Sequence, residues 1–264
     1  YQWLEKGPLR WRLRVVKKFQ QSVFTQDYCL TKDSPLLEIK TEVDWQETHV
    51  MVKAAFPVAL QSEFFTTEPP CAVVDRQTNP QTEMEKAQWE VPHQHWFSLT
   101  DQTQNYGVSL LNNCKYGCDV KDNLMRLTLL RSSVWPDPRA DRGKHKFSYY
   151  FYPHQGDWRS AKTVAMGYGI HRPLRPHFPE NFNSLSSQKL LFPGEPWLNL
   201  GSDNLGLMAL KQRDDNPDQW VLRCYETSGA SAQLKVTAAF DYKIKTRLNL
   251  LEEDQLGDNG NKVN

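Results

Sequence analysis

Long apolar runs and an excess of charge of either sign are both missing from this chain of 264 residues. No apolar stretch approaches the roughly 20 residues that a membrane-crossing helix needs. The 32 basic side chains are matched by 31 acidic ones, so the formal net charge is +1 and no long-range field attracts nucleic acid or an anionic membrane. We therefore expect no nucleic-acid partner and no membrane partner.

Cysteine is also scarce, and five cysteines, an odd number in a long chain, do not indicate a disulfide framework. A reducing compartment fits this usage best, so we expect a cytoplasmic protein. Cys114 and Cys118 are close enough in sequence to suggest a metal site, but no second cysteine pair completes a tetrahedral set of ligands. The better interpretation is that both are buried thiols.

The common catalytic signatures are missing as well, because the sequence has no GxSxG elbow, no glycine-rich phosphate loop and no HExxH motif. Asp137 and Asp141 lie in one loop segment, but nothing sets their carboxylates at the ~5 Å that a retaining glycosidase needs, so a solvated turn is the better interpretation. His93 and His95 would project to one face of a strand as two metal ligands, yet no third ligand is near. We predict no catalytic residue, no metal site and no cofactor within this chain.

The chain does have alternation of apolar and polar residues with a period of two, which indicates β-strands. In residues 9–15 arginines alternate with apolar residues, so we expect one buried and one solvated face. Residues 37–45 and 50–58, separated by a short polar break, predict two neighbouring strands. Further alternation at 125–129 and 147–151, with aromatic enrichment, favours an antiparallel sandwich. The predicted fold is all-β, with a large antiparallel β-sandwich of the supersandwich kind followed by a smaller β-sandwich unit.

One helix is predicted at about 158–170, where apolar residues recur at helical spacing before Pro173 stops the pattern. Beyond a stretch rich in Pro, Asn and Ser, residues 220–224 and 234–240 alternate again around an expected hairpin turn at 226–230. The predicted division is a large β-sandwich domain at 1–172, a linker at 173–188, a smaller β domain at 189–253 and a disordered tail at 254–264.

A long series of motifs occurs in the order found in one known enzyme family. The motifs are Glu42-Val43-Asp44-Trp45, Trp89-Glu90-Val91-Pro92, Asn112-Asn113-Cys114-Lys115-Tyr116-Gly117-Cys118-Asp119-Val120, Arg131-Ser132 and Asp141-Arg142-Gly143-Lys144-His145. Together they resemble the non-catalytic β-region of a family 38 α-mannosidase of the cytoplasmic type. Chance similarity does not extend this far in order, and the match spans most of residues 9–253.

The resemblance implies exo-hydrolysis of terminal α-mannosides with retention, by a zinc ion and an aspartate nucleophile in an N-terminal catalytic domain upstream of Tyr1. We expect this fragment to be inactive alone, with that domain of the same polypeptide as its partner and an α-mannoside or oligosaccharide as the substrate; homo-oligomer formation stays open. By the same analogy, substrate binding or the catalytic-domain interface is assigned to Lys115, Tyr116, Gly117, Arg131, Asp137 and Asp141.

Two alternatives stay open at this point. The guanidinium fork of Arg131 suits sugar hydroxyls or a carboxylate, and Gly117 lets a partner approach the backbone, but Arg131 could equally end a strand in an ion pair while Tyr116 packs. The second alternative for the whole chain is an autonomous carbohydrate-binding module, in which exposed Trp135 and Trp158 would stack on sugar rings.

Overall fold

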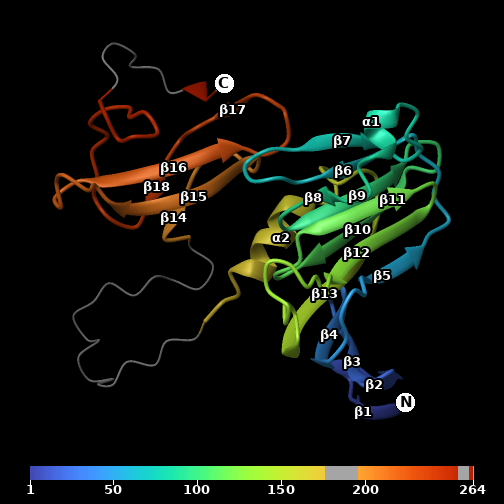
Figure 1. Cartoon of the computed structure of the whole chain (residues 1–264). Helices are drawn as coiled ribbons and strands as arrows, with labels where there is room; N and C mark the ends of the chain where they lie inside the picture. The colour runs from blue at the N-terminus through green and yellow to red at the C-terminus, as the bar shows by residue number, and fades with distance from the viewer. Residues whose placement is uncertain (176–195, 255–261, 264) are drawn as a thin grey trace, which may run out of the picture. The chain divides into compact units, whose positions relative to one another are not determined.

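The computed structural model describes residues 1–175, 196–254 and 262–263 (Figure 1). The chain divides into two compact units, Tyr1–Pro173 and Leu174–Asn264, and each is described by itself. Most of the linker predicted at 173–188 and most of the tail predicted at 254–264 lie outside the described residues. The predicted domain boundaries therefore stay predictions.

The first unit is a sandwich of two antiparallel sheets (Figure 1). The larger sheet has nine strands in the order β1-β2-β3-β4-β13-β10-β9-β6-β7, and the smaller has four in the order β5-β12-β11-β8. The larger sheet is formed by β1 (Gln2–Lys6), β2 (Arg10–Phe19), β3 (Ser22–Thr31), β4 (Leu37–Trp45), β6 (Phe64–Thr67), β7 (Val74–Gln77), β9 (Trp96–Asp101), β10 (Tyr106–Asn112) and β13 (Gly143–Gln155). The smaller sheet is formed by β5 (Val52–Pro57), β8 (Val91–Pro92), β11 (Gly117–Lys121) and β12 (Leu124–Leu130). The all-β antiparallel fold is thus confirmed.

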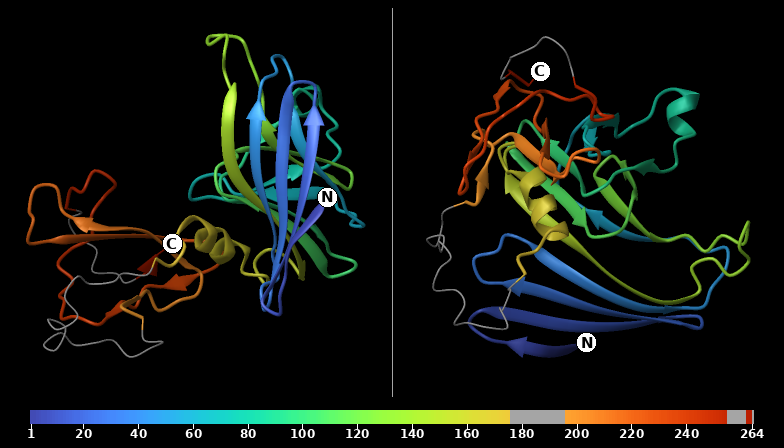
Figure 2. Two further views of the ribbon diagram at one scale, coloured as in Figure 1. Left: turned by 90° about the horizontal axis from the view of Figure 1, so that it is seen from below. Right: turned by 90° about the vertical axis from the view of Figure 1, so that its left-hand side faces the viewer.

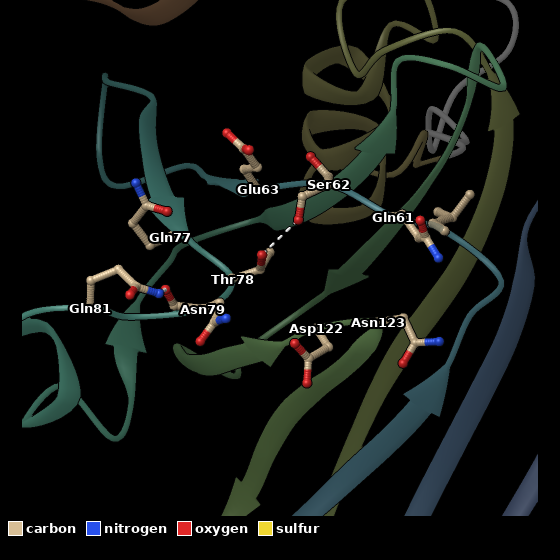
Figure 3. A pocket seen from close by; sticks show the side chains of 10 residues that line it. Gln61, Ser62, Glu63, Gln77, Thr78, Asn79, Gln81, Asp122 and Asn123 are labelled. Atoms are coloured by element: carbon tan, nitrogen blue, oxygen red, sulfur yellow. Dashed lines mark hydrogen bonds between the residues drawn. The ribbon is translucent and has the colours of Figure 1, made fainter.

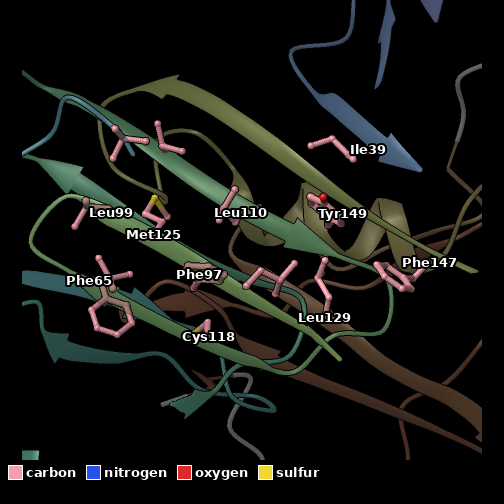
Figure 4. Close-up of a cluster of buried hydrophobic side chains, with 14 of the residues drawn as sticks. Ile39, Phe65, Phe97, Leu99, Leu110, Cys118, Met125, Leu129, Phe147 and Tyr149 are labelled. Atoms are coloured by element: carbon pink, nitrogen blue, oxygen red, sulfur yellow. The ribbon is translucent and has the colours of Figure 1, made fainter. Parts of the chain in front are cut away.

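The main hydrophobic core lies between these two sheets, where side chains from both inner faces interdigitate (Figure 4). Ile39 and Leu110 come from the larger sheet, and Met125 and Leu127 come from β12 of the smaller one; none is more than 1% exposed. Such packing follows from the period-two pattern, because every second side chain of a strand points to the same face. The core fixes the positions of the loops at the strand ends.

A second cluster of buried side chains covers the opposite face of the larger sheet, and the helix α2 (Thr163–His171) packs there (Figure 2). Trp96, Leu111, Tyr152 and Trp158 form its centre. The only other described helix is α1 (Glu83–Lys86), a single turn capped by Thr82. Among the described residues, no helix is long and apolar enough to cross a bilayer.

The helix predicted at 158–170 starts five residues too early. Residues 158–162 form turns, and Lys162 has a left-handed backbone with φ of 53°. Asp157 explains the delay, because its carboxylate accepts the backbone N–H of Ser160 at 2.9 Å and so stabilises a turn. Trp158 packs on Trp96 with ring centroids 5.0 Å apart, which also holds this segment outside the helix.

The strands predicted at 37–45 and 50–58 are present but are not neighbours. β4 pairs with β3 and β13 in the larger sheet, whereas β5 pairs with β12 in the smaller one. The polar break between them carries the chain from one layer to the other. His49 has a positive φ of 56° in this break, and its backbone N–H donates to the backbone oxygen of Ser132 at 2.8 Å.

The first predicted strand is also present, as β2, but its apolar face is not buried. Trp11 is 55% exposed, and Arg12 and Arg14 on the other face are partly covered because both donate to the carboxylate of Asp27. Trp11 pairs with Leu30, which pairs with Leu37, so the face is the inner face of the larger sheet. Figure 1 shows the reason, because β1 and β2 lie at the edge of that sheet, away from β5 and β12.

The second unit contains three two-stranded antiparallel sheets among its described residues. These pair β14 (Leu198–Asn199) with β18 (Thr237–Ala238), β15 (Leu205–Gln212) with β16 (Trp220–Glu226), and β17 (Ala232–Gln233) with β19 (Lys262–Val263). The predicted hairpin between 220–224 and 234–240 is therefore wrong. β16 pairs with β15 instead, through a turn in which the backbone N–H of Arg213 donates to the backbone oxygen of Gln219 at 2.9 Å.

Candidate functional site

The loop from β10 to β11 carries Lys115 and Tyr116, two of the predicted site residues. A buried asparagine at the end of β10 holds this loop. The side-chain oxygen of Asn112, which is 0% exposed, accepts the backbone N–H of Lys115 at 2.6 Å. Its side-chain nitrogen lies 3.0 Å from Nε2 of His93 and donates to the backbone oxygen of Gln94 at 3.1 Å. One amide group therefore joins the loop to the segment before β9.

His93 also holds this loop, through its backbone. Its backbone N–H donates to the backbone oxygen of Tyr116 at 3.0 Å, and its ring packs edge-on against Phe97 with centroids 5.0 Å apart. Burial lowers the pKa of His93 from 6.5 to about 3, so this imidazole is neutral at physiological pH. Its Nδ1 has no hydrogen-bond partner in the described part of the chain.

The histidine pair at 93 and 95 does not act as a unit. Nδ1 of His95 lies 2.8 Å from the carboxylate of Glu68, and its ring lies 4.3 Å from that of His171, whose Nε2 contacts the backbone oxygen of Asn112 at 2.8 Å. His93 instead turns toward Asn112. Across the described residues, no three or more His, Cys, Asp or Glu side chains are grouped so that they could hold a metal ion.

Lys115, Arg131 and Asp141 are brought together by the structure. One carboxylate oxygen of Asp141 accepts the backbone N–H groups of Ser132 at 2.9 Å and Arg131 at 3.0 Å. The hydrogen bond from Ser132, followed by that from Arg131, lowers the pKa of Asp141, while partial burial opposes the shift. The charges of Asp141 and Lys115 also interact. Asp141 is therefore ionised and fixes the end of β12.

The two cations of this group differ in exposure. Lys115 is half-buried, with its Nζ 4.1 Å from the ring centre of Phe147. Burial lowers the pKa of Lys115, and the carboxylate of Asp141 opposes that change. The side chain of Arg131 is exposed and forms no ion pair with any described residue. Its five donors thus remain available to a partner or a sugar.

The other predicted site residues make different contacts. Tyr116 is 58% exposed and so lies outside the hydrophobic core. Gly117 faces Glu90, and a Cβ at this position would lie 1.6 Å from a carboxylate oxygen of Glu90. Asp137 lies in an exposed turn, where it accepts the backbone N–H of Arg139 at 2.8 Å. Its carboxylate thus stabilises its own turn, whereas that of Asp141 binds the backbone after β12.

Two sequence interpretations need correction here, and one residue was missed. Cys118 is buried, as predicted, but Cys114 is exposed. Trp158 is only 4% exposed and cannot stack on a sugar at the surface, whereas Trp135 is 84% exposed. Asn112 was missed as the residue that holds the loop. The signal was a polar residue that ends β10 directly after the apolar pair Leu110-Leu111.

Two sequence profiles identify the class of protein. The sequence profile described as "Glycosyl hydrolases family 38 C-terminal domain" matches residues 1–139, and that described as "Glycosyl hydrolases family 38 C-terminal beta sandwich domain" matches residues 204–264. The chain belongs to the C-terminal region of glycosyl hydrolase family 38.

Individual relatives carry the name α-mannosidase. Alpha-mannosidase 2C1 of Mus musculus is 30% identical over 236 residues, which is 88% of this chain and 22% of that protein. Alpha-mannosidase G of Dictyostelium discoideum is 27% identical over 259 residues, which is 95% of this chain and 23% of that protein. The chain thus spans less than a quarter of these curated relatives.

A solved structure shares the fold. The crystal structure of an α-mannosidase from Enterococcus faecalis V583 has a TM-score of 0.70 to this chain at 17% sequence identity, covering 90% of this chain and 30% of that one. At this sequence identity the likeness supports a shared fold and carries no statement about function.

Proposed function

We propose that this chain is the non-catalytic β-region of a longer, retaining exo-α-mannosidase, which removes terminal α-mannosides from a glycoside or oligosaccharide. In this proposal the region supports an N-terminal catalytic domain and contributes the edge of its active site. The family membership, the names of the relatives and the 22% of a relative's length that the chain spans all support it. A cytoplasmic location fits the free, buried thiols of Cys29 and Cys118.

The observation that carries the proposal is an exposed apolar patch on the inner face of the sheet formed by β1 to β3. We call it the β1–β3 face and define it by Trp3, Trp11 and Leu30, which are 41%, 55% and 52% exposed. Trp3 and Trp11 are in edge-to-face contact, with ring centroids 5.9 Å apart. Exposed apolar patches of this kind mark surfaces that another protein surface covers. The remainder of the longer polypeptide is the proposed occupant.

The edge of the active site is assigned to Lys115, Arg131 and Asp141. Asp141 fixes the backbone of Arg131, and the exposed guanidinium of Arg131 can donate to a sugar hydroxyl or a carboxylate of the catalytic domain. The zinc ion and the aspartate nucleophile of the enzyme belong, in this proposal, to the catalytic domain. The described residues of this chain offer no suitable cluster of ligands, so no chemical step is assigned to them.

Hydrolysis of an aryl α-mannoside tests whether the reacting groups lie outside this chain. The purified chain with added zinc is compared with the longer polypeptide under the same conditions. We expect turnover by the longer polypeptide only, because the chain supplies an edge and not the reacting groups. Zinc-dependent turnover by the chain alone would overturn the proposal.

Two substitutions test the assigned contacts. In the longer polypeptide, Arg131→Ala should lower kcat/KM by about tenfold, equivalent to about 1.4 kcal/mol of transition-state binding, with an unchanged melting temperature. Arg139→Ala, in the exposed turn nearby, is the control and should keep wild-type kinetics. Wild-type kinetics in the Arg131 variant would refute its role at the active site.

Trp11→Ser tests the β1–β3 face. In the isolated chain this exposed residue should change stability by only about 0.5 kcal/mol, whereas in the longer polypeptide its burial should make the same change cost about 3 kcal/mol. Val16→Ser is the matched control, because Val16 is 58% exposed and lies on the opposite face of β2. Equal effects of Trp11→Ser in the two proteins would show that nothing covers this face.

A further inference from the structure

Two side chains open the hydrogen-bonded ladder between β9 and β10 at its last pair of residues. Leu111 is paired with Trp96, so the next opposite residues are Asn112 and His95. The backbone N–H of Asn112 donates to the backbone oxygen of His95 at 3.1 Å, as in a regular antiparallel pair. The return bond is replaced, because the backbone N–H of His95 donates instead to the carboxylate of Glu68 at 3.0 Å.

The helix α2 supplies the donor that the oxygen of Asn112 would otherwise lack. Nε2 of His171, at the C-terminal end of this helix, lies 2.8 Å from that backbone oxygen. A carbonyl oxygen can only accept, so Nε2 carries the proton and donates it. On the other side of the open pair, Glu68 is 2% exposed and its carboxylate also lies 2.8 Å from Nδ1 of His95. The rings of His95 and His171 touch, with centroids 4.3 Å apart, so the four residues form one closed group.

The helix can reach the end of the ladder because a glycine faces it. A Cβ atom added at Gly167 would lie 3.0 Å from Cβ of His95 and 3.3 Å from Cδ1 of Trp96. Carbon atoms pack best at about 3.5–4.0 Å, so an alanine here would push the helix away from the start of β9. A Cβ atom added at Gly169 would meet nothing within 4 Å. The two glycines of the helix therefore differ in their distance from the sheet.

Asn112 joins the helix to the loop that carries Lys115. Its backbone oxygen is held by His171, and its side-chain oxygen accepts the backbone N–H of Lys115 at 2.6 Å. Asn112 is 0% exposed, so a polar group of this residue that loses its partner stays unsatisfied unless the backbone shifts. Lys115 is bonded to the same asparagine and would shift with it.

We propose that His171 is a positioning residue, which sets the place of Lys115 through the backbone of Asn112. The helix α2 is thus the support of the loop from β10 to β11, and the contribution of Lys115 to the active-site edge depends on how the helix is docked. The effect on catalysis rests on the proposed function. The link from His171 to the backbone of Lys115 stands without it.

Amide hydrogen exchange of the 264-residue chain, measured by NMR at the backbone N–H of Lys115, tests this link. His171→Phe keeps an aromatic ring but removes the donor, so exchange should become about tenfold faster, as for the loss of one buried hydrogen bond. His171→Gln, whose side-chain amide can donate to the same oxygen, should restore most of the protection. Thr78→Val is the matched control, because it removes a hydrogen bond of 2.6 Å to the backbone oxygen of Ser62, drawn in Figure 3, and should leave Lys115 unchanged.

Gly167→Ala and Gly169→Ala form a second matched pair. Both add one methyl group and both raise the intrinsic helix propensity of α2, but only the methyl group at 167 meets the sheet. Gly167→Ala should therefore speed the exchange of Lys115 about threefold, whereas Gly169→Ala should not speed it. Exchange at Met125, in the main hydrophobic core, reports on unfolding of the whole unit and should change much less than exchange at Lys115.

Kinetics of the longer polypeptide with an aryl α-mannoside test the effect on catalysis. His171→Phe should lower kcat/KM about fivefold, because a displaced Lys115 no longer fits the active-site edge, and His171→Gln should restore it. A double-mutant cycle separates positioning from general damage. If His171 acts through Lys115, His171→Phe should have no further effect in a protein that already carries Lys115→Met.

Three results would overturn the inference. The first is unchanged exchange at Lys115 in His171→Phe, and the second is equal acceleration at Lys115 and Met125, which would mean general destabilisation. The third is independent, multiplicative effects of His171→Phe and Lys115→Met on kcat/KM. Wild-type kcat/KM in Lys115→Met, together with faster exchange at Lys115 in His171→Phe, would instead confirm the link and overturn the active-site edge of the proposed function. The two failures are therefore distinguishable.

Discussion

Acidification should destabilise the first unit through a single buried histidine, His93. The side-chain nitrogen of Asn112 lies 3.0 Å from Nε2 of His93 and can only donate, so Nε2 acts as the acceptor and the ring proton lies on Nδ1. A second proton on Nε2 would point at this NH₂ group. The ring is also 3% exposed, and burial lowers its pKa to about 3. Both effects hold the imidazole neutral in the folded protein.

The size of the effect follows from proton linkage. The ordinary pKa of His93 is 6.5 and its folded value is about 3, so between these values the unfolded chain binds a proton that the folded chain does not. The contribution of His93 is therefore complete above pH 6.5 and is lost as the pH falls toward 3. From pH 7 to pH 5 the loss is about 1.5 pKa units at about 1.36 kcal/mol each, or about 2 kcal/mol.

Urea unfolding followed by tryptophan fluorescence at pH 7 and pH 5 measures this loss. The wild-type chain should lose about 2 kcal/mol more than His93→Phe, in which the ring remains but cannot be protonated. His154 and His171 also have a pKa lowered by burial, but they are present in both proteins and cancel. His49→Asn is the control, because His49 is exposed and asparagine tolerates its positive φ. Equal pH dependence in wild type and His93→Phe would refute the reasoning.

Two further predictions concern the loops around Lys115. Asp141→Ala should cost about 1–3 kcal/mol in urea unfolding, because two backbone N–H groups lose their acceptor, whereas Asp137→Ala should cost about 0.5 kcal/mol or less. This difference should shrink in acid, because the pKa of Asp141 is lowered in the folded protein and its contribution to the free energy of unfolding is lost as the pH falls through that folded pKa. Equal costs of the two substitutions at neutral pH would show that the carboxylate of Asp141 does not stabilise the backbone after β12. Iodoacetamide labelling read by mass spectrometry should modify Cys114 in the native chain and spare Cys118, which is buried and whose pKa burial raises. Native labelling of Cys118 would contradict the core packing.

Strands with strict alternation could be predicted from the sequence, whereas their assignment to layers could not. Residues 37–45 correspond to β4 (Leu37–Trp45), and residues 125–129 lie within β12 (Leu124–Leu130). Alternation is a local property, since it depends only on which face of one strand is buried. The partner of β5 is β12, far along the chain, and nothing in residues 50–58 indicates it. Neighbouring strands in sequence were therefore placed in one sheet when they belong to two.

The second unit shows a different limit. β15 contains the run Leu207-Met208-Ala209-Leu210, which does not alternate, so a period-two search passes over it. Without β15, the alternating residues of β16 were paired with the next alternating stretch at 234–240. The cluster of Asp, Asn and Pro at 214–218 was the available turn signal, and it does connect β15 to β16.

The candidate site could be predicted in part. Lys115, Arg131 and Asp141 are grouped by the structure, while Tyr116, Gly117 and Asp137 lie in other surroundings. The family resemblance pointed to these residues. The buried polar side chains that hold them in place could not be predicted from the sequence, because a polar residue is buried only where a distant partner forms a hydrogen bond with it.

The buried network beneath the loop from β10 to β11 bears on its role. Asn112 from β10, His93 from the segment before β9 and His171 from α2 meet there. The contact between Asn112 and His93 is buried and shielded from water, and that of His171 is partly buried. The loop is thereby fixed to both sheets and to the helix. A connection between two strands needs no such support, whereas a group at the edge of an active site must be held within a fraction of an ångström. This rigidity favours a functional role for Lys115 over that of a simple connection.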